Sequence, residues 1–177
     1  MAAPATPGRQ VEVNGASLYV EEHGAGVPLV LVHGATRSRR MWDPTLPFLT
    51  PYARVITFDN RGHGHSTDPS GGITYRLIAN DTAALVEALG LDRPLVGGYS
   101  LGGLVALEFG LHHSHLARGL IVGGATTGTE IDVARAQLRT AMYGDQDGIV
   151  DFDALERENP ALVPLLRAMQ PDGDQHW

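Results

Sequence analysis

Residues 97–103 read Gly-Gly-Tyr-Ser-Leu-Gly-Gly, and the rest of the chain can be interpreted outward from this stretch. Residues 94–96 before it are a short apolar run of the length that a buried strand needs, and residues 104–109 after it contain no helix breaker. The stretch therefore predicts a strand that turns into a helix within three residues. Such a turn holds Ser100 in a strained conformation and leaves room only for glycine on either side of it.

Two interpretations of Ser100 compete. In the structural one, the serine merely caps the helix that follows. In the functional one, Ser100 is a nucleophile, because the unpaired N–H groups and the partial positive charge of a helix N-terminus suit a group that forms an oxyanion. A Gly-x-Ser-x-Gly pattern alone is weak in a chain with 22 glycines among 177 residues. Two further motifs upstream favour the nucleophile.

Composition restricts the classes of protein and partner. The length of 177 residues corresponds to one domain, or to one domain with a small appendage, and 43% hydrophobic residues are enough for a core. A net charge of −7 argues against nucleic acid or an anionic membrane as a partner, and the lack of cysteine excludes disulfides and a thiol nucleophile. Without a membrane-length apolar run or a secretory signal, we expect a soluble cytoplasmic protein.

Strands and helices are predicted to alternate along residues 9–128, after a disordered tail at residues 1–8. Asn14-Gly15 between two alternating runs is a hairpin signal. The hydrophobic patterns predict further strands at 28–32, 54–58, 94–96 and 118–122, and helices at 41–49, 73–89 and from 101 to about 113. This order predicts an α/β fold: a mostly parallel sheet with an N-terminal hairpin and crossover helices.

A second motif, His33-Gly34-Ala35, follows the predicted strand at 28–32. It leaves the carboxyl edge of the sheet, where ligands bind in open α/β folds. We expect Gly34 to allow a tight turn that points the Ala35 N–H into the site. There it would bind an oxyanion together with the Leu101 N–H. For the His33 side chain we expect a local structural role.

Two polar stretches near the same edge are assigned to structure. The basic cluster at residues 37–40 is interpreted as solvated surface, with an anion contact as the alternative. Residues 59–66, Asp-Asn-Arg-Gly-His-Gly-His-Ser, could form a metal site, carry catalytic groups, or act as a scaffold. The run offers no fixed metal geometry, so we favour a scaffold in which Asp59 and Arg61 tie the loop down by hydrogen bonds.

Together the three motifs resemble the α/β-hydrolase superfamily over about residues 11–124, and specifically its serine-nucleophile, esterase- and lactonase-like branch. The resemblance implies a serine hydrolase of a small ester, lactone or related carbonyl substrate. Ser100 would form an acyl-enzyme, a histidine oriented by a carboxylate would act as base, and the Ala35 and Leu101 amides would hold the oxyanion. It implies no cofactor and no metal. Epoxide hydrolases and haloalkane dehalogenases of this fold place an aspartate at the serine position.

The chain departs from this family where the acid and the histidine are expected. In this fold they follow the nucleophile in that order, each after a later strand, but no strand pattern ending in an acid follows residue 124. His112, with His113 and His115 beyond it, would lie about 18 Å from Ser100 along a helix. His176 with Asp145 or Asp147 has the correct order, yet those acids fall between predicted helices.

We therefore expect a truncated core, with the last strands missing, and a partial helical cap at residues 129–177. Two functions stay open: the serine hydrolase, or a catalytically impaired hydrolase-fold fragment or binding module that lacks the triad acid and histidine. Residues 120–122 would be left as an unpaired apolar edge strand. We expect this edge to cause self-association or to pair with a complementing C-terminal segment.

Overall fold

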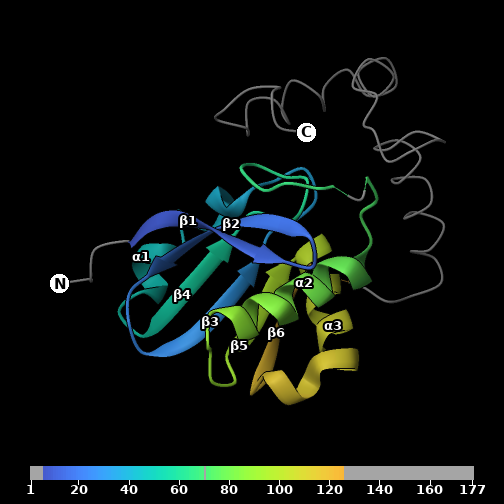
Figure 1. The fold of residues 1–177 in the computed structure, drawn as a ribbon. Helices are drawn as coiled ribbons and strands as arrows, with labels where there is room; N and C mark the ends of the chain where they lie inside the picture. The colour runs from blue at the N-terminus through green and yellow to red at the C-terminus, as the bar shows by residue number, and fades with distance from the viewer. Residues whose placement is uncertain (1–5, 70, 126–177) are drawn as a thin grey trace, which may run out of the picture.

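A β-hairpin opens the fold in the computed structural model, which describes residues 6–69 and 71–125 (Figure 1). Strands β1 (Thr6–Val13) and β2 (Ala16–His23) pair antiparallel. The turn between them is Asn14-Gly15, and both residues have positive φ, as the predicted two-residue turn requires. Because β1 begins at Thr6, residues 6–8 belong to a strand, and the predicted tail at 1–8 is wrong for these residues. Residues 1–5 lie outside the described part.

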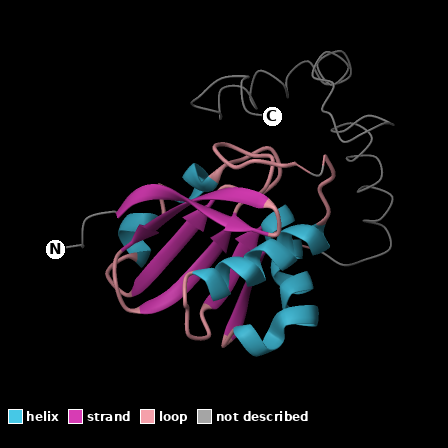
Figure 2. Ribbon diagram, viewed as in Figure 1, coloured by secondary structure: helices cyan, strands magenta, loops and turns pink. Residues whose placement is uncertain are grey.

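Six strands form one sheet in the order β1-β2-β4-β3-β5-β6 (Figure 2). The later strands are β3 (Val27–Val32), β4 (Ala53–Phe58), β5 (Leu95–Tyr99) and β6 (Gly119–Gly123). These four run parallel to one another, and the hairpin joins them through the antiparallel pair β2–β4. The predicted mostly parallel sheet with an N-terminal hairpin is confirmed.

Helices cover both faces of the sheet. The long helices α2 (Tyr75–Ala88) and α3 (Leu101–His113) contact each other on one face, and the short helix η2 (Ser114–Leu116) follows α3 (Figures 1 and 2). They pack on Val30, Val32 and their neighbours. On the opposite face, a smaller cluster around Leu29 and Leu31 packs against η1 (Arg39–Trp42) and α1 (Leu46–Leu49). Alternate β3 residues thus serve opposite faces, which explains why the strand is apolar throughout.

The single helix predicted at residues 41–49 is wrong, because the chain forms η1 and α1 with a turn between them. Pro44 lies in that turn and Pro47 in the first turn of α1. Proline has no backbone N–H, so it cannot donate the hydrogen bond that a continuous helix requires. Three apolar side chains of this region, Trp42, Leu46 and Leu49, still pack on the sheet as they would from one face of a helix. Phe48, by contrast, is 76% exposed.

Strand β6 is an apolar edge of the described sheet. Among the described strands it pairs only with β5, and Leu120, Ile121 and Val122 are 39%, 48% and 41% exposed. The expected unpaired edge is therefore present in this part of the chain. The predicted cap at residues 129–177 lies outside the described residues. Within residues 6–69 and 71–125, no helix is both long and apolar enough to cross a bilayer.

Candidate active site

The Ser100 motif and the His33-Gly34-Ala35 motif meet at one point of the sheet. Strand β3 lies between β4 and β5, so the chain leaves β3 toward one side and later returns to the other. In open α/β sheets, ligands bind beside the carboxyl ends of strands at such a reversal. Because Val32 pairs with Gly98, the turn after β3 and Ser100 after β5 emerge side by side.

Ser100 occupies a strained turn between β5 and α3. Its φ of 56° and ψ of −117° lie outside the regions that residues with a side chain normally adopt. Its backbone N–H donates to the Gly123 carbonyl at 2.9 Å, which ties the turn to β6. The hydroxyl makes no capping hydrogen bond to α3, and the residue is exposed. The structural interpretation of Ser100 as a helix cap is therefore wrong.

The glycines on either side of Ser100 let the helix start pack on bare backbone. A Cβ on Gly98 would overlap the Gly102 carbonyl group, and a Cβ on Gly102 would overlap the Val32 carbonyl oxygen. The latter would also lie 2.9 Å from the His33 carbonyl oxygen. The start of α3 thus lies directly against the ends of β5 and β3, as the sequence predicted.

The turn after β3 lies against the turn that carries Ser100. A Cβ on Gly34 would be 3.4 Å from the Tyr99 carbonyl oxygen and 3.7 Å from the Ser100 Cβ. The next peptide carries the Ala35 N–H, and Thr36 then reverses the chain with a φ of 56°. Ala35 and Ser100 therefore share one site, and Leu101 begins α3 immediately beside it with its side chain buried.

His33 fixes the orientation of the Gly34–Ala35 peptide. Its Nε2 accepts the Asn60 N–H at 2.9 Å, so the ring carries its proton on Nδ1 and donates it to the Gly34 carbonyl at 2.8 Å. That carbonyl belongs to the same peptide plane as the Ala35 N–H, and the two point in opposite directions in a trans peptide. Holding the carbonyl at His33 therefore turns the Ala35 N–H away from the ring.

The His33 ring is held neutral. Burial, followed by repulsion from His63 and Arg39, lowers the pKa of His33 to about 3, although the hydrogen bond to the Gly34 carbonyl acts in the opposite direction. Burial also lowers the pKa of His63, whose Nδ1 lies 2.9 Å from the Arg61 carbonyl oxygen. These two buried histidines play structural roles, which is the role that we expected for the His33 side chain.

The loop at residues 59–66 is a scaffold, as the sequence indicated. The buried Asp59 carboxylate accepts hydrogen bonds from the Arg39 backbone at 2.8 Å, the Arg39 guanidinium at 2.9 Å and the His65 backbone at 3.0 Å. Arg61, 1% exposed, donates to both Asp81 carboxylate oxygens, at 2.6 and 2.7 Å. Asp59 therefore links the loop to η1, and Arg61 links it to α2.

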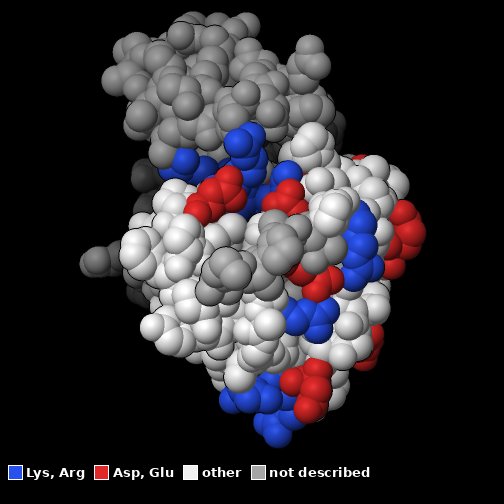
Figure 3. All heavy atoms as spheres, turned by 90° about the vertical axis from the view of Figure 1, so that its left-hand side faces the viewer, with Lys and Arg blue, Asp and Glu red and all other residues white. Residues whose placement is uncertain are grey.

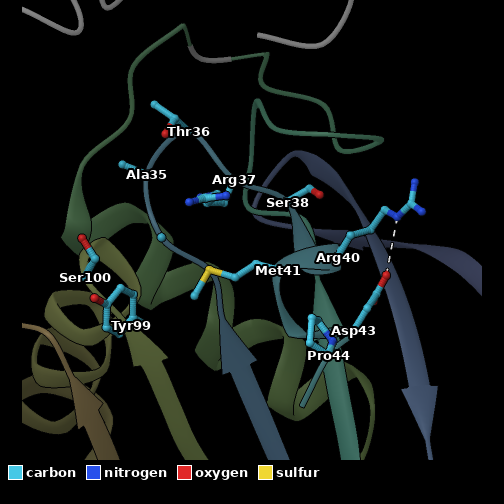
Figure 4. Close-up of a pocket in the computed structure, with 11 residues that line it drawn as sticks. Ala35, Thr36, Arg37, Ser38, Arg40, Met41, Asp43, Pro44, Tyr99 and Ser100 are labelled. Carbon is cyan, nitrogen blue, oxygen red and sulfur yellow. Dashed lines mark ion pairs between the residues drawn. The ribbon is translucent and has the colours of Figure 1, made fainter. Parts of the chain in front are cut away.

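A cavity of about 760 Å³ opens over Ser100 (Figure 4). Its wall comes from the turn after β3, from η1 and the residues that follow it, and from the end of β5, and it consists of Gly34, Ala35, Thr36, Arg37, Ser38, Arg40, Met41, Asp43, Pro44, Tyr99 and Ser100. Sequence reasoning did not assign Arg37, Met41 or Tyr99 to the site. The signal for Tyr99 was its place inside the Gly-x-Ser-x-Gly motif, and for Arg37 its place shortly after Ala35.

No described histidine lines this cavity. His33 and His63 are buried in the scaffold. His112 and His113 end α3 on the side away from Ser100, and His115 lies in η2 beyond it. His176 lies outside the described residues, as do Asp145 and Asp147. The described part of the site thus contains a strained serine beside two backbone N–H groups, without a histidine partner.

Comparison with known proteins gives a consistent family. Residues 27–162 match the family described as alpha/beta hydrolase fold. A soluble epoxide hydrolase of Corynebacterium sp. is 36% identical over 113 residues, which cover 64% of this chain and 40% of that protein. A 2-hydroxy-6-oxo-2,4-heptadienoate hydrolase of Pseudomonas putida is 36% identical over 124 residues, 67% of this chain and 44% of that protein. A solved N-acyl homoserine lactone degrading enzyme is 27% identical with a TM-score of 0.70, covering 93% of this chain and 67% of that one.

The chain spans less than half the length of these two curated relatives. Their names also include an epoxide hydrolase, so overall similarity does not separate the serine-bearing branch that the motifs favoured from its neighbours. The fold assignment does not depend on that distinction. The family match covers most of the chain, and all three motifs lie at the strand ends where the fold requires them. The chain therefore belongs to the α/β hydrolase fold family.

Proposed function

We propose that Ser100 is the nucleophile of a serine hydrolase that acts on a small ester, lactone or related carbonyl substrate. The observation that carries this proposal is the position of Ser100. The residue is exposed in a cavity, strained at a φ of 56°, and makes no capping hydrogen bond. Strain of this kind persists only where the surrounding structure enforces it, and it clusters at active sites.

The chemistry follows from the neighbours of Ser100. Its Oγ attacks the carbonyl carbon and forms a tetrahedral oxyanion, which the Ala35 and Leu101 N–H groups would bind. The leaving alcohol departs with a proton, the acyl group stays on Ser100 as an ester, and water hydrolyses that ester. The role of His33 in this scheme is to hold the Gly34–Ala35 peptide so that its N–H turns toward the oxyanion.

A serine at position 100 also favours acyl transfer over epoxide opening. Attack of a serine hydroxyl on an epoxide would leave an ether on the enzyme, and an ether has no carbonyl carbon for water to attack. An acyl-serine is an ester, which water can hydrolyse. The lactone-degrading enzyme among the structural neighbours supports the acyl substrate, whereas the epoxide hydrolase among the relatives does not.

The alternative is a catalytically impaired hydrolase fold or a binding module. It is favoured by one observation, that no described histidine lines the cavity. A nucleophile without a base keeps the residual acceleration that an oxyanion hole and substrate binding provide, roughly 10³–10⁴-fold over water. Weak ester hydrolysis alone would therefore not distinguish the two functions.

Labelling with a serine-directed fluorophosphonate separates them. The full chain, Ser100→Ala and Ser114→Ala would be treated in parallel and analysed by intact mass. Ser114 follows the opposite end of α3 and is exposed, so its variant controls for the loss of a surface serine. Rapid single labelling of the full chain and of Ser114→Ala, but not of Ser100→Ala, with a titration near pH 7, would support the serine hydrolase. No labelling of the full chain would favour the impaired fold.

A further inference from the structure

Three arginines follow the turn that carries Ala35, and two of them are neutralised by acidic partners. Arg39 forms ion pairs with Asp59 and Glu21, both at 2.9 Å. Arg40 lies 3.6 Å from the Asp43 carboxylate (Figure 4). Arg37 has neither an ion pair nor a hydrogen bond with any described residue. The three arginines of the basic cluster at residues 37–40 therefore lie in three different environments.

Arg37 is exceptional among the nine arginines of the described part. Every other one forms an ion pair with a carboxylate or donates a hydrogen bond to a backbone carbonyl; these are Arg9, Arg39, Arg40, Arg54, Arg61, Arg76, Arg93 and Arg118. Figure 3 shows the same tendency on the face that it displays, where basic and acidic atoms lie directly beside one another. An unpaired guanidinium is thus not the usual state of an arginine in this part of the protein.

The unpaired guanidinium belongs to the cavity that contains the nucleophile. Arg37 is half-buried and lines the wall of that cavity together with Ser100. Figure 4 shows its side chain pointing into the cavity, on the side where Ala35 and Ser100 lie. The Cα atoms of Ala35 and Arg37 are at most about 7 Å apart, because only two peptide units separate them. One small molecule can therefore contact both the Ala35 N–H and the Arg37 guanidinium.

We propose that Arg37 binds a carboxylate of the ligand, so that this site takes small carbonyl compounds with one carboxylate near the reacting carbonyl. The inference about the reacting carbonyl rests on the proposed function, whereas the carboxylate site does not. A guanidinium presents parallel N–H groups that match a carboxylate. One uncompensated positive charge balances the single charge of a carboxylate but not both charges of a phosphate dianion, because Arg40 and Asp43 in the same wall offset each other.

Benzoate and benzamide provide a matched pair of probes, since they share size and shape and differ in charge. Binding of each would be followed by NMR chemical-shift titration on the full chain carrying Ser100→Ala, so that no chemistry is needed. We expect benzoate to bind roughly tenfold more tightly than benzamide, the value typical of one charge-assisted hydrogen-bonded contact. The preference should shrink as the salt concentration rises, because the site is open to solvent.

Three further variants test whether Arg37 causes the preference for benzoate over benzamide. Arg37→Gln should bring the two affinities within about twofold of each other, and Arg37→Lys should retain part of the difference because it keeps the charge. Arg76→Gln removes the same charge on α2, where Arg76 pairs with Glu108 outside the cavity, and should leave the preference unchanged. This variant controls for net charge.

The outcomes separate this proposal from the proposed function. A benzoate preference that is lost in Arg37→Gln supports the carboxylate site even if Ser100 does not react with a fluorophosphonate. Equal binding of both probes, no binding of benzoate, or a preference that survives in Arg37→Gln would each overturn it, even if Ser100 is labelled.

Discussion

Replacing Gly102 with alanine tests whether close backbone packing sets the position of Ser100. Gly102 is buried in the first turn of α3, where alanine should favour the helix by about 1 kcal/mol. The added methyl group would overlap the Val32 carbonyl oxygen and lie 2.7 Å from the Val32 carbonyl carbon, where ordinary contact begins near 3.4 Å. These atoms are backbone at the end of β3 and cannot rotate away. The helix start must therefore move away from the sheet.

The overlap should outweigh the gain in helix propensity. Overpacking a tight site costs typically 1–3 kcal/mol and more where the backbone must move, so we expect a net loss of about 2–3 kcal/mol in the free energy of unfolding. A loss of this size shifts the urea midpoint down by roughly 1–2 M. The rate of fluorophosphonate labelling of Ser100 should fall by more than the loss of folded protein explains, because the same movement separates Ser100 from the Gly34–Ala35 turn.

Gly110→Ala is the matched control, since Gly110 lies in the same helix and gains the same propensity. Its methyl group would meet only the Cδ1 end of the Leu120 side chain, which is 39% exposed and can rotate aside. Urea denaturation of both variants, with labelling under native conditions, should therefore show a large loss for Gly102→Ala and little or none for Gly110→Ala. Equal stability of Gly102→Ala and the parent chain, with unchanged labelling, would refute the packing argument.

Further predictions concern charge and association. The free energy of unfolding should fall as the pH drops from about 6.5 toward 3, because the unfolded chain protonates His33 near its ordinary pKa while the folded protein holds that pKa at about 3. Urea titrations at several pH values should show a shallower fall for His33→Gln than for the parent chain. An equal or steeper fall would contradict this reasoning. Asp81→Asn should lower the free energy of unfolding by about 3 kcal/mol, because the buried Arg61 loses the carboxylate that accepts two of its hydrogen bonds. Asp43→Asn, which breaks an exposed ion pair, should lower it by under about 1 kcal/mol. Equal losses in urea denaturation would argue against a structural role for the buried pair. We also expect the β6 edge at residues 120–122 to cause self-association or to take up a complementing segment, so a concentration-independent monomer in gel filtration would count against that expectation.

Local patterns predicted the parts of the fold that depend on local chemistry. Asn14-Gly15 specified the hairpin turn, and the apolar runs specified β3, β4 and β5 to within a few residues. The region at 41–49 failed because hydrophobic spacing was weighed above Pro44 and Pro47, each of which interrupts helical hydrogen bonding. Trp42, Leu46 and Leu49 nevertheless pack on the sheet, whereas Phe48 does not, since burial depends on spacing more than on an unbroken helix.

The arginine cluster shows why the site could be predicted only in part. Ser100 and Ala35 are marked by glycines that are neighbours in sequence, so their strained turns could be predicted from short motifs. The state of Arg37 depends instead on which acids reach which arginines. Arg39 is neutralised by Glu21 and Asp59, which lie 18 and 20 positions away and meet it only because β2, β4 and η1 converge. Sequence spacing treats residues 37–40 as one basic patch, whereas the folded chain pairs two of the arginines and directs the third into the cavity over Ser100. A charge left unpaired inside a site, rather than a run of like charges, is therefore the feature that points to a ligand.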